Sequence, residues 1–577
     1  MTDMNRLKLI PSKAQYKPSE EIGLQLRLRT NQQAKLAFQW TLFELDRPIL
    51  KGEGKLACAE SGESEISFVI PAQTNGSGAY GVFVTATDEH GGTLEAETAF
   101  DVAAHWNEAP RYGFLSDFAP GDAGDSTDID FLNENHINIV QFYDWMYRHD
   151  QLIPDTDEFT DPLNRRISLG VVREKMQGLR KHGIASIAYA AVYASLRDYL
   201  EKHPEQALYR NDGEPYSLGN FFYIMDICAE SEWTDHIIAE FIKVIEMGFD
   251  GLHLDQYGLP KKAIRRKNNQ TEVVSLKELY PEFINRTREA VAQKWPEVGL
   301  IFNNVSNYPV HTTARAEQDV IYIEVWDPMT HLRDIKQLID RARELSGKQV
   351  VLAAYLPAFH PERPIAQEEA EIGATVTMAT IFASGGYHLL LGEHENVLTE
   401  GYYPKYGSIS SSFKQTLTHY YDFIVMYRNL LFDLQLEDIS MTFTGGINTE
   451  VSFVKEGYQF SPNQQLNSVW TIVKEKPGFT IMHAINLYEL DNDVWHQGKT
   501  QAPPVLTDIE MTVEVLEEIE GVFWSSPDDS TIQAKPLAYE WVTKDEYSGR
   551  YIRFTLPLLA YWSMVYIKTK HGISTSG

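Results

Sequence analysis

The chain has 577 residues, of which 43% are hydrophobic and 12% aromatic, and its 51 Lys and Arg against 81 Asp and Glu give a net charge of −30. This apolar and aromatic content excludes an intrinsically disordered chain. The length indicates roughly three or four domains of ~150 residues, or fewer if one of them is a large barrel. The negative charge argues against nucleic acid and anionic membranes as partners, because both bind basic surfaces. A neutral or cationic substrate is therefore expected.

The two cysteines, Cys58 and Cys228, are far apart in the sequence, and we expect two buried free thiols rather than a disulfide. No apolar run approaches the ~20 residues of a membrane span. Residues 1–16 also lack the apolar stretch of a signal peptide. As written, the chain is expected to be cytoplasmic, and secreted if its N-terminus has been trimmed.

The first hundred residues alternate between apolar and polar side chains in short runs, separated by turn sequences such as NGSG and HGG. This spacing is typical of a β-sandwich. We expect a sandwich over residues 1–105. Its predicted strands are 22–29, 35–44, 64–70, 79–88 and 93–102.

From Tyr112 onward, apolar runs of strand length alternate with amphipathic helical segments, the pattern of a parallel sheet built from βα units. Eight such strands over ~300 residues predict a (β/α)₈ barrel, which we assign to residues 106–432. The predicted strands are 112–118, 137–144, 184–193, 249–256, 299–305, 320–326, 349–356 and 385–392. Helices are predicted at 169–183, 234–248, 276–295 and 413–431. The connection 194–248 is the longest and is expected to be mostly helical.

The remainder, residues 433–577, again consists of strand-like runs, beginning at 441–446, and predicts a second all-β domain. β-domains commonly flank the barrels of carbohydrate enzymes, although this is an argument from analogy.

Polar residues that close the strands of such a barrel face the active site. Here they are mainly carboxylates, amides and aromatic rings, a lining that suits a neutral polyol because rings stack on sugars and the polar groups bind hydroxyls. The expected substrate-binding residues are Asp117, Tyr143, Asp144, Trp145, Tyr193, Tyr257, Asn303, Trp326, Tyr355 and His388.

Two strand-end carboxylates are the expected catalytic residues. Asp255 closes the apolar strand FDGLHLDQ, where an isolated charge needs a partner or a chemical task; the alternative is a structural Asp that caps the following segment. Glu324 interrupts VIYIEVW, an apolar setting that favours the protonated form of a general acid; the alternative is pairing with a buried Arg or Lys. Two such carboxyl groups support glycoside hydrolysis. The sequence periodicity does not indicate whether the anomeric configuration is retained or inverted.

Other chemistries have weaker support, because the sequence contains no GxGxxG after a strand, GxxxxGK[ST], HExxH, paired CxxC or GxSxG motif. A metallohydrolase in which His253, His388 and His394 join the two carboxylates is the remaining alternative. We predict neither a cofactor nor a metal.

Six segments in order resemble glycoside hydrolase family 66, the family of endo-dextranases and cycloisomaltooligosaccharide glucanotransferases. They are RYGFLSDF, INIVQFYDWMYRHD, GFDGLHLDQYG, FNNVSNYP, IYIEVW and GEHENVLTEGYYPKYG. The resemblance implies an N-terminal immunoglobulin-like sandwich, a C-terminal Greek-key β-domain and a retaining mechanism on α-1,6-linked glucan. It also implies that Asp255 is the nucleophile and Glu324 the acid/base, with Tyr143 and Asp144 on glucose hydroxyls.

The sequence departs from the cyclising members of that family, which carry a carbohydrate-binding module inserted in the barrel region. No connection between the predicted barrel strands is long enough to hold one. We therefore expect a monomeric endo-hydrolase acting on dextran or isomalto-oligosaccharides, with a glucanotransferase as the alternative. A glycan-binding protein without activity is a third possibility, disfavoured because both carboxylates are present.

Overall fold

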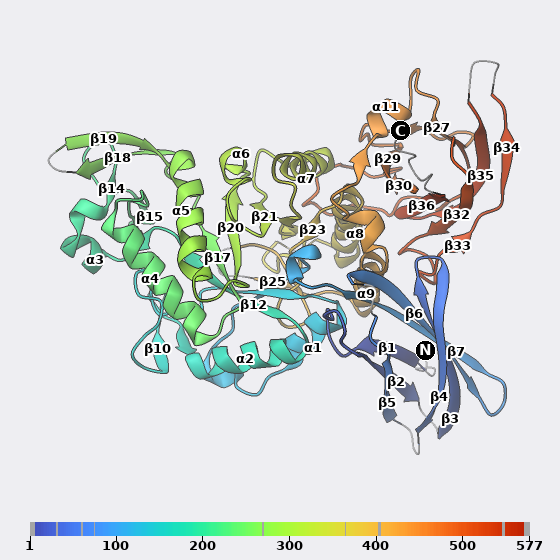
Figure 1. The fold of residues 1–577 in the computed structure, drawn as a ribbon, viewed down its shortest axis with the longest axis horizontal. Helices are drawn as coiled ribbons and strands as arrows, with labels where there is room; N and C mark the ends of the chain where they lie inside the picture. The colour runs from blue at the N-terminus through green and yellow to red at the C-terminus, as the bar shows by residue number, and fades with distance from the viewer. Residues whose placement is uncertain are drawn as a thin grey trace, which may run out of the picture.

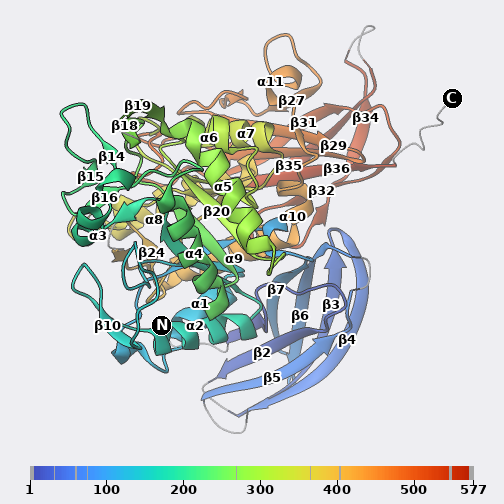
Figure 2. The ribbon, with the colours of Figure 1, turned by 60° about the vertical axis from the view of Figure 1, so that its left-hand side comes forward.

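The computed structural model describes residues 6–570 apart from 31–32, 59–61, 74–75, 268–269, 364, 402–404 and 545–548. Figure 1 shows the barrel, coloured cyan to yellow, with a blue β-region at its lower right and an orange-to-red β-region at its upper right. Figure 2 shows the same two β-regions beside each other after rotation. The expected order of β-domain, barrel and β-domain is confirmed.

The barrel is an eight-stranded parallel sheet in the order β23-β22-β21-β20-β17-β12-β9-β8. All eight expected strands are present. Their bounds are β8 (Tyr112–Leu115), β9 (Ile139–Phe142), β12 (Ala185–Ala191), β17 (Gly251–Asp255), β20 (Gly299–Val305), β21 (Val320–Glu324), β22 (Val350–Ala353) and β23 (Tyr387–His388).

Helices follow the strands and cover the outside of the barrel, as Figure 1 shows for α2, α4 and α5. Their buried faces are apolar, as in α7, where Leu332, Ile335 and Ile339 recur at helical spacing. The helices of this ring are α1 (Thr127–Glu134), α2 (Leu169–Lys181), α4 (Glu232–Met247), α5 (Leu276–Ala292), α6 (Val310–Thr313), α7 (Leu332–Ser346), α8 (Gln367–Ser384), α9 (Ser411–Met426) and α10 (Arg428–Leu431).

The side chain of Glu393 connects the first barrel strand, β8, to the last, β23. Glu393, which follows β23, accepts hydrogen bonds from the backbone N–H groups of Ser116 and Asp117 beyond β8, at 2.8 and 2.7 Å. Its other oxygen accepts the hydroxyls of Ser116 and Tyr406. These bonds satisfy a carboxylate that is fully buried and hold the two ends of the sheet together.

Short sheets in the loops at the strand ends were not expected. The connection 194–248 contains α3 (Arg197–Lys202) and α4, but most of the part before α4 is strand and loop, so its expected helical character is wrong. The additional strands are β10 (Glu158–Thr160), β11 (Arg166–Ser168), β13 (Ala194–Ser195), β14 (Leu208–Tyr209), β15 (Ser217–Leu218), β16 (Phe222–Ile224), β18 (Lys262–Lys267), β19 (Gln270–Ser275), β24 (Val397–Leu398) and β25 (Tyr406–Gly407).

Two antiparallel sheets form the N-terminal sandwich, in the orders β1-β2-β5 and β4-β3-β6-β7. Alternate residues of each strand are buried between them, as in β2, where Leu24, Leu26 and Leu28 are inaccessible. The strands are β1 (Arg6–Pro11), β2 (Ile22–Thr30), β3 (Ala34–Glu44), β4 (Arg47–Cys58), β5 (Gly62–Ile70), β6 (Gly78–Asp88) and β7 (Thr93–Val102).

The C-terminal region also contains two antiparallel sheets, β26-β29-β30-β36-β32-β33 with β28 beside β29, and β27-β31-β35-β34. The expected strand at 441–446 is wrong, because the short helix α11 (Ser440–Phe443) occupies its first half. The strands are β26 (Glu437–Asp438), β27 (Val451–Val454), β28 (Phe460–Ser461), β29 (Val469–Lys476), β30 (Phe479–Asn486), β31 (Leu506–Glu514), β32 (Ile519–Ser525), β33 (Lys535–Pro536), β34 (Tyr539–Val542), β35 (Tyr551–Leu559) and β36 (Trp562–Thr569). The domain boundaries at 105/106 and 432/433 stay a prediction.

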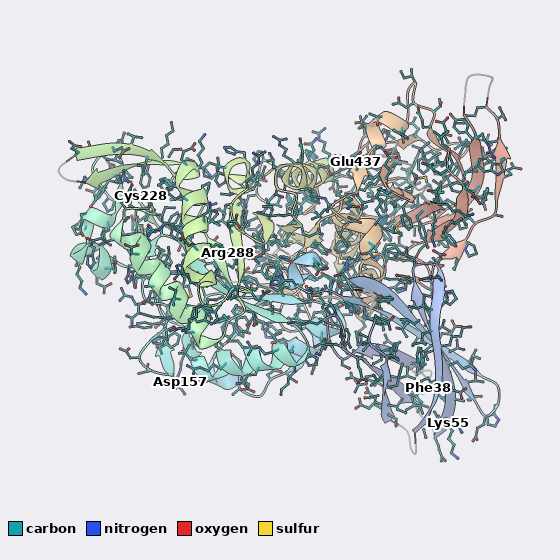
Figure 3. The ribbon with its side chains drawn as sticks, in the orientation of Figure 1. Phe38, Lys55, Asp157, Cys228, Arg288 and Glu437 are labelled. Atoms are coloured by element: carbon teal, nitrogen blue, oxygen red, sulfur yellow. The ribbon has the colours of Figure 1, made fainter. Side chains whose placement is uncertain are left out.

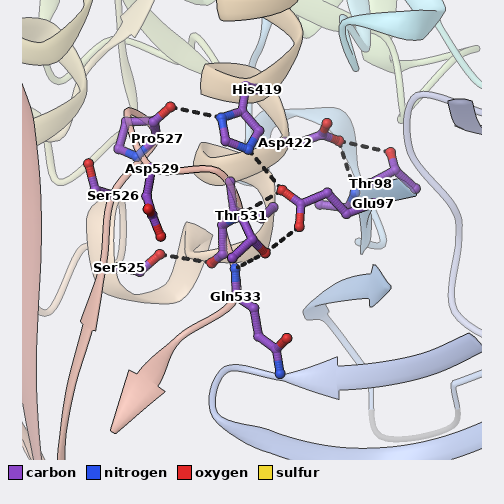
Figure 4. Close-up of polar contacts among 12 residues, drawn as sticks. Glu97, Thr98, His419, Asp422, Ser525, Ser526, Pro527, Asp529, Thr531 and Gln533 are labelled. Atoms are coloured by element: carbon purple, nitrogen blue, oxygen red, sulfur yellow. Dashed lines mark hydrogen bonds and ion pairs between the residues drawn. The ribbon is translucent and has the colours of Figure 1, made fainter. Parts of the chain in front are cut away.

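The barrel and both β-regions meet around helix α9, as Figure 4 shows. Nε2 of His419 lies 2.8 Å from Glu97 of β7, and Nδ1 lies 2.8 Å from the carbonyl of Pro527. Glu97 also accepts the backbone N–H of Ile532. Both ring nitrogens of His419 face acceptors, so both carry protons and the ring is a cation. Burial alone would lower the pKa of His419, but the Glu97 carboxylate outweighs it and raises that pKa.

Cys228 is a buried free thiol, as expected, and burial raises its pKa to about 11. Figure 3 shows it at the barrel end opposite the N-terminal sandwich, where Phe38 and Lys55 are labelled. The side chain of Cys58 lies outside the described residues, although its backbone belongs to β4 of that sandwich. Among the described helices, none is both long enough and apolar enough to cross a membrane.

Candidate active site

The strand that ends at Asp255 begins shortly after a sharp turn. Gly248 ends α4 with φ of +117°, a conformation that glycine adopts without strain, and the chain then enters β17. Along β17, His253 and Asp255 point to the barrel interior while Leu252 and Leu254 alternate with them. Asp255 is the last residue of this strand. Glu324 is the last residue of β21, two strands away in the sheet.

An aromatic layer fills the barrel beneath the two carboxylates. The ring of His253 lies 4.6 Å from Tyr322, 6.0 Å from Tyr112 and 6.3 Å from Tyr189, between ring centroids. Inward-facing side chains from different strands form such layers in (β/α)₈ barrels. This layer closes the bottom of the site and excludes water from below.

Asn303 of β20 bridges the two carboxylates. Its Nδ2 group donates to Oδ1 of Asp255 at 2.7 Å and to Oε2 of Glu324 at 3.2 Å. These two oxygens are therefore no farther apart than the sum of the two distances. The hydroxyl of Tyr189 donates to the other oxygen of Asp255 at 2.7 Å, and the hydroxyl of Tyr355 donates to Glu324 at 3.1 Å.

Both carboxylates are buried, and within the described ranges neither forms an ion pair with a cationic side chain. Burial, followed by the nearby charge of Glu324, raises the pKa of Asp255 to about 7. Burial also raises the pKa of Glu324. The shorter hydrogen bonds to Asp255 favour its ionised form, because donors stabilise the charged state of a carboxylate.

A cavity of about 360 Å³ opens above this pair. Asp255, Glu324 and three predicted substrate-binding residues line it, namely Tyr143, Asn303 and Tyr355. The partly buried ring of Trp326 lies 6.0 Å from Tyr355, at the edge of the site. These residues come together as expected, and their roles toward a substrate stay a prediction.

Tyr193 and Tyr257 lie beside the cavity and hold the loop that follows β17. The hydroxyl of Tyr193 donates to the carbonyl of Leu259 and accepts the backbone N–H of Tyr257, both at 2.7 Å. The two rings meet edge to face, with centroids 5.5 Å apart. Tyr193 therefore holds the loop after β17 in position and does not line the cavity.

Four other predicted residues are not in the cavity wall. Trp145 is wholly buried, packs on Phe249 and donates its indole N–H to the carbonyl of Tyr189. It is therefore a core residue in this structure, not an exposed sugar platform. Asp144 lies 3.5 Å from Arg165, in a neighbouring cavity.

Asp117 and His388 also lie away from the carboxylate pair. Asp117 is partly exposed and pairs with His394 at 3.1 Å. His388 is buried, and its Nε2 faces the carbonyl of Ala354 at 2.8 Å. Nδ1 of His253 meets the hydroxyl of Tyr112. The three histidines of the metallohydrolase alternative thus do not converge on Asp255 and Glu324.

One group of potential metal-binding side chains occurs in the described ranges, Asp117, Glu393 and His394, whose donor atoms lie within 4.8 Å of one another. Glu393 already accepts four hydrogen bonds there. This satisfied set closes the barrel seam, and nothing about it indicates a metal.

Sequence reasoning missed the cavity residues that lie within strands rather than at their ends. Gln141, Tyr189 and Tyr322 face inward from β9, β12 and β21. For Tyr189 and Tyr322, the signal that could have found them is a hydroxyl-bearing side chain two residues before a strand end, on the same face as the last residue of the strand. Phe114, Gln256 and Gly401 complete the missed part of the wall.

Comparison with known proteins gives a family for the whole chain. A model described as glycosyl hydrolase family 66 matches residues 11–566. A cycloisomaltooligosaccharide glucanotransferase from Niallia circulans is 24% identical over 718 aligned residues, covering 98% of this chain and 72% of that protein. A dextranase from Streptococcus salivarius is 24% identical over 567 aligned residues, covering 86% and 68%.

Among solved structures, a Paenibacillus sp. cycloisomaltooligosaccharide glucanotransferase complexed with cycloisomaltoheptaose has the same fold. The TM-score is 0.85 at 22% sequence identity, over 97% of this chain and 99% of that one. The family model covers the barrel and both catalytic candidates. The chain therefore belongs to glycosyl hydrolase family 66.

Proposed function

We propose that the protein is a retaining endo-glycosidase that cleaves α-1,6-glucosidic linkages of dextran or isomalto-oligosaccharides. The observation that carries the proposal is the buried carboxylate pair bridged by Asn303, whose two nearest oxygens both contact one amide nitrogen. Retaining enzymes hold their carboxyl groups ~5–5.5 Å apart, whereas inverting enzymes need ~6.5–9.5 Å to admit a water molecule between them. The substrate class is inferred from the dextranase and glucanotransferase relatives.

In the first step, a carboxylate oxygen of Asp255 attacks C1 of a glucosyl unit, and the C1–O6 bond breaks as Glu324 gives its proton to the departing O6. This forms a covalent β-glucosyl ester. Glu324, now ionised, removes a proton from water, whose oxygen attacks C1 and releases Asp255. Two inversions at C1 leave the product in the α configuration.

The arrangement of donors suits both steps. Tyr189 and Asn303 fix Asp255 in one orientation, which keeps the attacking oxygen in place. Tyr355 and Asn303 hold Glu324 so that its proton can be delivered on the leaving-group side. Burial raises the pKa of Glu324, which favours the protonated form that a general acid requires.

The proposal is tested with Asp255→Asn and Glu324→Gln variants on dextran and isomaltotetraose. We expect turnover to fall by about 10⁴-fold or more for Asp255→Asn. Asp327→Asn is the matched control, because this exposed carboxylate follows β21 without reaching the cavity. NMR of the first product should show the α anomer. Near-wild-type hydrolysis by Asp255→Asn, or a β product, would refute the assignment.

Glucanotransferase activity is the second candidate, supported by the names of two relatives. A sugar hydroxyl competes with water for the same glucosyl ester, so the residues above would serve either reaction. We prefer hydrolysis for two reasons. The alignment with the Niallia circulans glucanotransferase extends over 718 residues, whereas this chain has 577, so the relative contains segments that this chain lacks. In addition, no connection between the barrel strands of this chain is long enough to hold an inserted module. Chromatography at high isomaltotetraose concentration separates the two: cyclic or longer products would establish transfer.

A further inference from the structure

Loop 491–499 of the C-terminal β-region, between β30 and β31, reaches the barrel and contacts segment 327–332, which follows β21. Glu324 is the last residue of β21, so this segment lies just beyond the predicted acid/base. We propose that Trp495 of this loop is a positioning residue for Glu324, on which it acts through the segment and through Trp326. The inference rests on the proposed function, since it takes Glu324 to be the acid/base.

Trp495 holds the segment by two hydrogen bonds. Its indole N–H donates to the carbonyl of Met329 at 2.8 Å, and its backbone N–H donates to the carbonyl of Thr330 at 3.0 Å. Only 4% of Trp495 is exposed, so both bonds come from a residue that is fixed in the core. Its own carbonyl accepts the hydroxyl of Thr377 in α8 at 2.6 Å. Trp495 therefore connects the segment to a helix of the barrel.

Asp493 adds two contacts to the same segment. Its carbonyl accepts the backbone N–H of Leu332, where α7 begins, at 2.9 Å. Its carboxylate lies 2.8 Å from Nδ1 of His331. Segment 327–331 is exposed or only partly buried, and such a segment has few packing contacts of its own to fix its position. The bonds from loop 491–499 therefore help to determine where it lies.

Loop 491–499 is itself held in shape by a buried cation. Lys499 is inaccessible to solvent, and its ammonium group donates three hydrogen bonds within the loop. The acceptors are the carbonyls of Val494 and Gln497, at 2.8 and 3.0 Å, and Oδ1 of Asn492, at 2.8 Å. Because a buried ammonium group is costly unless its donors are satisfied, these bonds favour one closed conformation of the loop.

Trp326 connects the anchored segment to the acid/base. Its carbonyl accepts the backbone N–H of Met329 at 3.2 Å. Its indole N–H, the one donor of that side chain, donates to the carboxylate of Glu324. Its ring centroid also lies 6.0 Å from that of Tyr355, whose hydroxyl donates to Glu324. A displaced segment would move this indole relative to Glu324, and catalysis is sensitive to such small displacements.

The test compares two substrates that differ in their need for a proton. Dextran requires Glu324 to protonate the departing oxygen, whereas the fluoride of α-isomaltosyl fluoride leaves without a proton from the enzyme. Trp495→Phe keeps a buried ring and removes the indole N–H. We expect kcat on dextran to fall about 10-fold, a part of the roughly 10²- to 10⁴-fold that general acid catalysis contributes. The first-turnover rate of fluoride release should stay near that of the wild type.

Trp470→Phe is the matched control. Trp470 lies in the same β-region, is also buried, and donates its indole N–H to the carbonyl of Pro462, in that region, at 3.0 Å. Its loss should lower the temperature of thermal unfolding without changing either rate. Asp493→Ala removes the contact with His331 and leaves Trp495 in place, so it should reduce kcat on dextran selectively but by a smaller factor. This variant carries the test if Trp495→Phe does not fold.

Three results would overturn the positioning role. They are an equal loss on both substrates, an unchanged kcat on dextran in folded Trp495→Phe and Asp493→Ala, and a dextran-selective loss in Trp470→Phe. A wild type that cleaves no α-1,6-glucan, or a Glu324→Gln variant as active as the wild type, refutes the proposed function instead. The two failures are therefore distinguishable.

Discussion

Buried carboxylates occur in two regions of this protein with opposite surroundings. Asp101, where the N-terminal sandwich meets the barrel, accepts hydrogen bonds from Arg111 at 2.8 Å and from Arg428 at 2.9 Å. Burial alone would raise the pKa of Asp101, but the two guanidinium groups lower it. Asp255 and Glu324 are also buried, yet within the described ranges they accept hydrogen bonds from neutral hydroxyl and amide groups, and both pKa values are raised.

The comparison shows that the charge of the partners, rather than burial, separates a structural carboxylate from a reactive one. Two cations make the ionised form of Asp101 stable over the working pH range, so it cannot exchange a proton there. Neutral donors orient Asp255 and Glu324 without fixing their charge, which leaves the pair able to hold one proton and pass it to a substrate. The four predictions that follow probe this difference, beginning with the largest effect.

Among these four predictions, loss of the Glu324 proton should have the largest effect. Glu324→Gln is expected to lower kcat on dextran by about 10²- to 10⁴-fold, the usual contribution of general acid catalysis. An α-isomaltosyl fluoride, whose leaving group needs no proton, should still form the glucosyl ester at a rate close to that of the wild type. Rapid-quench measurement of fluoride release checks this, and an equally large loss on the fluoride would contradict the assigned role.

Substitution of the buried carboxylate should destabilise the protein much more at Asp101 than at Asp255. Asp101→Asn leaves Arg111 and Arg428 without their anion and should reduce the free energy of unfolding by about 3–5 kcal/mol. Asp255→Asn removes a charge that has no cationic partner in the part of the chain that the structure describes, so we expect no comparable loss. Chemical denaturation of both variants beside the wild type measures the difference, and equal destabilisation would be inconsistent with the comparison.

The domain junction should respond to pH through His419. Its pKa is raised in the folded state, so its contribution to stability is fully present below pH ~6.5 and is lost as the pH rises through the folded pKa. His419→Gln should therefore cost about 1.5–3 kcal/mol at pH 6 and less at pH 9. Thermal unfolding at several pH values checks this; a cost that does not change with pH would argue against an imidazolium at this junction.

The smallest effect concerns the acidic limb of the pH profile. Asp255 must be ionised to attack, so kcat/KM falls as the pH drops through its pKa, which the Glu324 charge helps to raise. Removing that charge in Glu324→Gln should move the acidic limb, measured with the fluoride substrate, to lower pH by about one unit. An unmoved acidic limb would mean that the two groups do not interact.

Much of the site could be predicted because a charge at the end of an apolar strand is conspicuous. Asp255 and Glu324 stand out for this reason, and the alternation of strands and helices predicts that their strand ends meet in a barrel. The inward-facing Gln141 and Tyr322 could not be identified in the same way, because the face of a strand that turns inward depends on its neighbours. The short sheets at the barrel mouth were missed because their strands are only a few residues long.

Trp145 shows most clearly what could not be predicted from the sequence. It follows the same strand end as Tyr143, yet Asp144 between them has a φ of +48°, in the left-handed region, and the indole of Trp145 lies in the core. No composition or spacing rule anticipates that turn.

The sequence by itself determined the architecture, the barrel and the two carboxylates, since strand period, helix period and isolated charges are local properties of the chain. The tertiary structure alone decided which partners surround each charge. Asp101 and His419 acquire their partners from distant segments, as Asp255 acquires Tyr189 and Asn303. Ionisation depends on the electrostatic field of all neighbouring groups, and only folding brings those groups together.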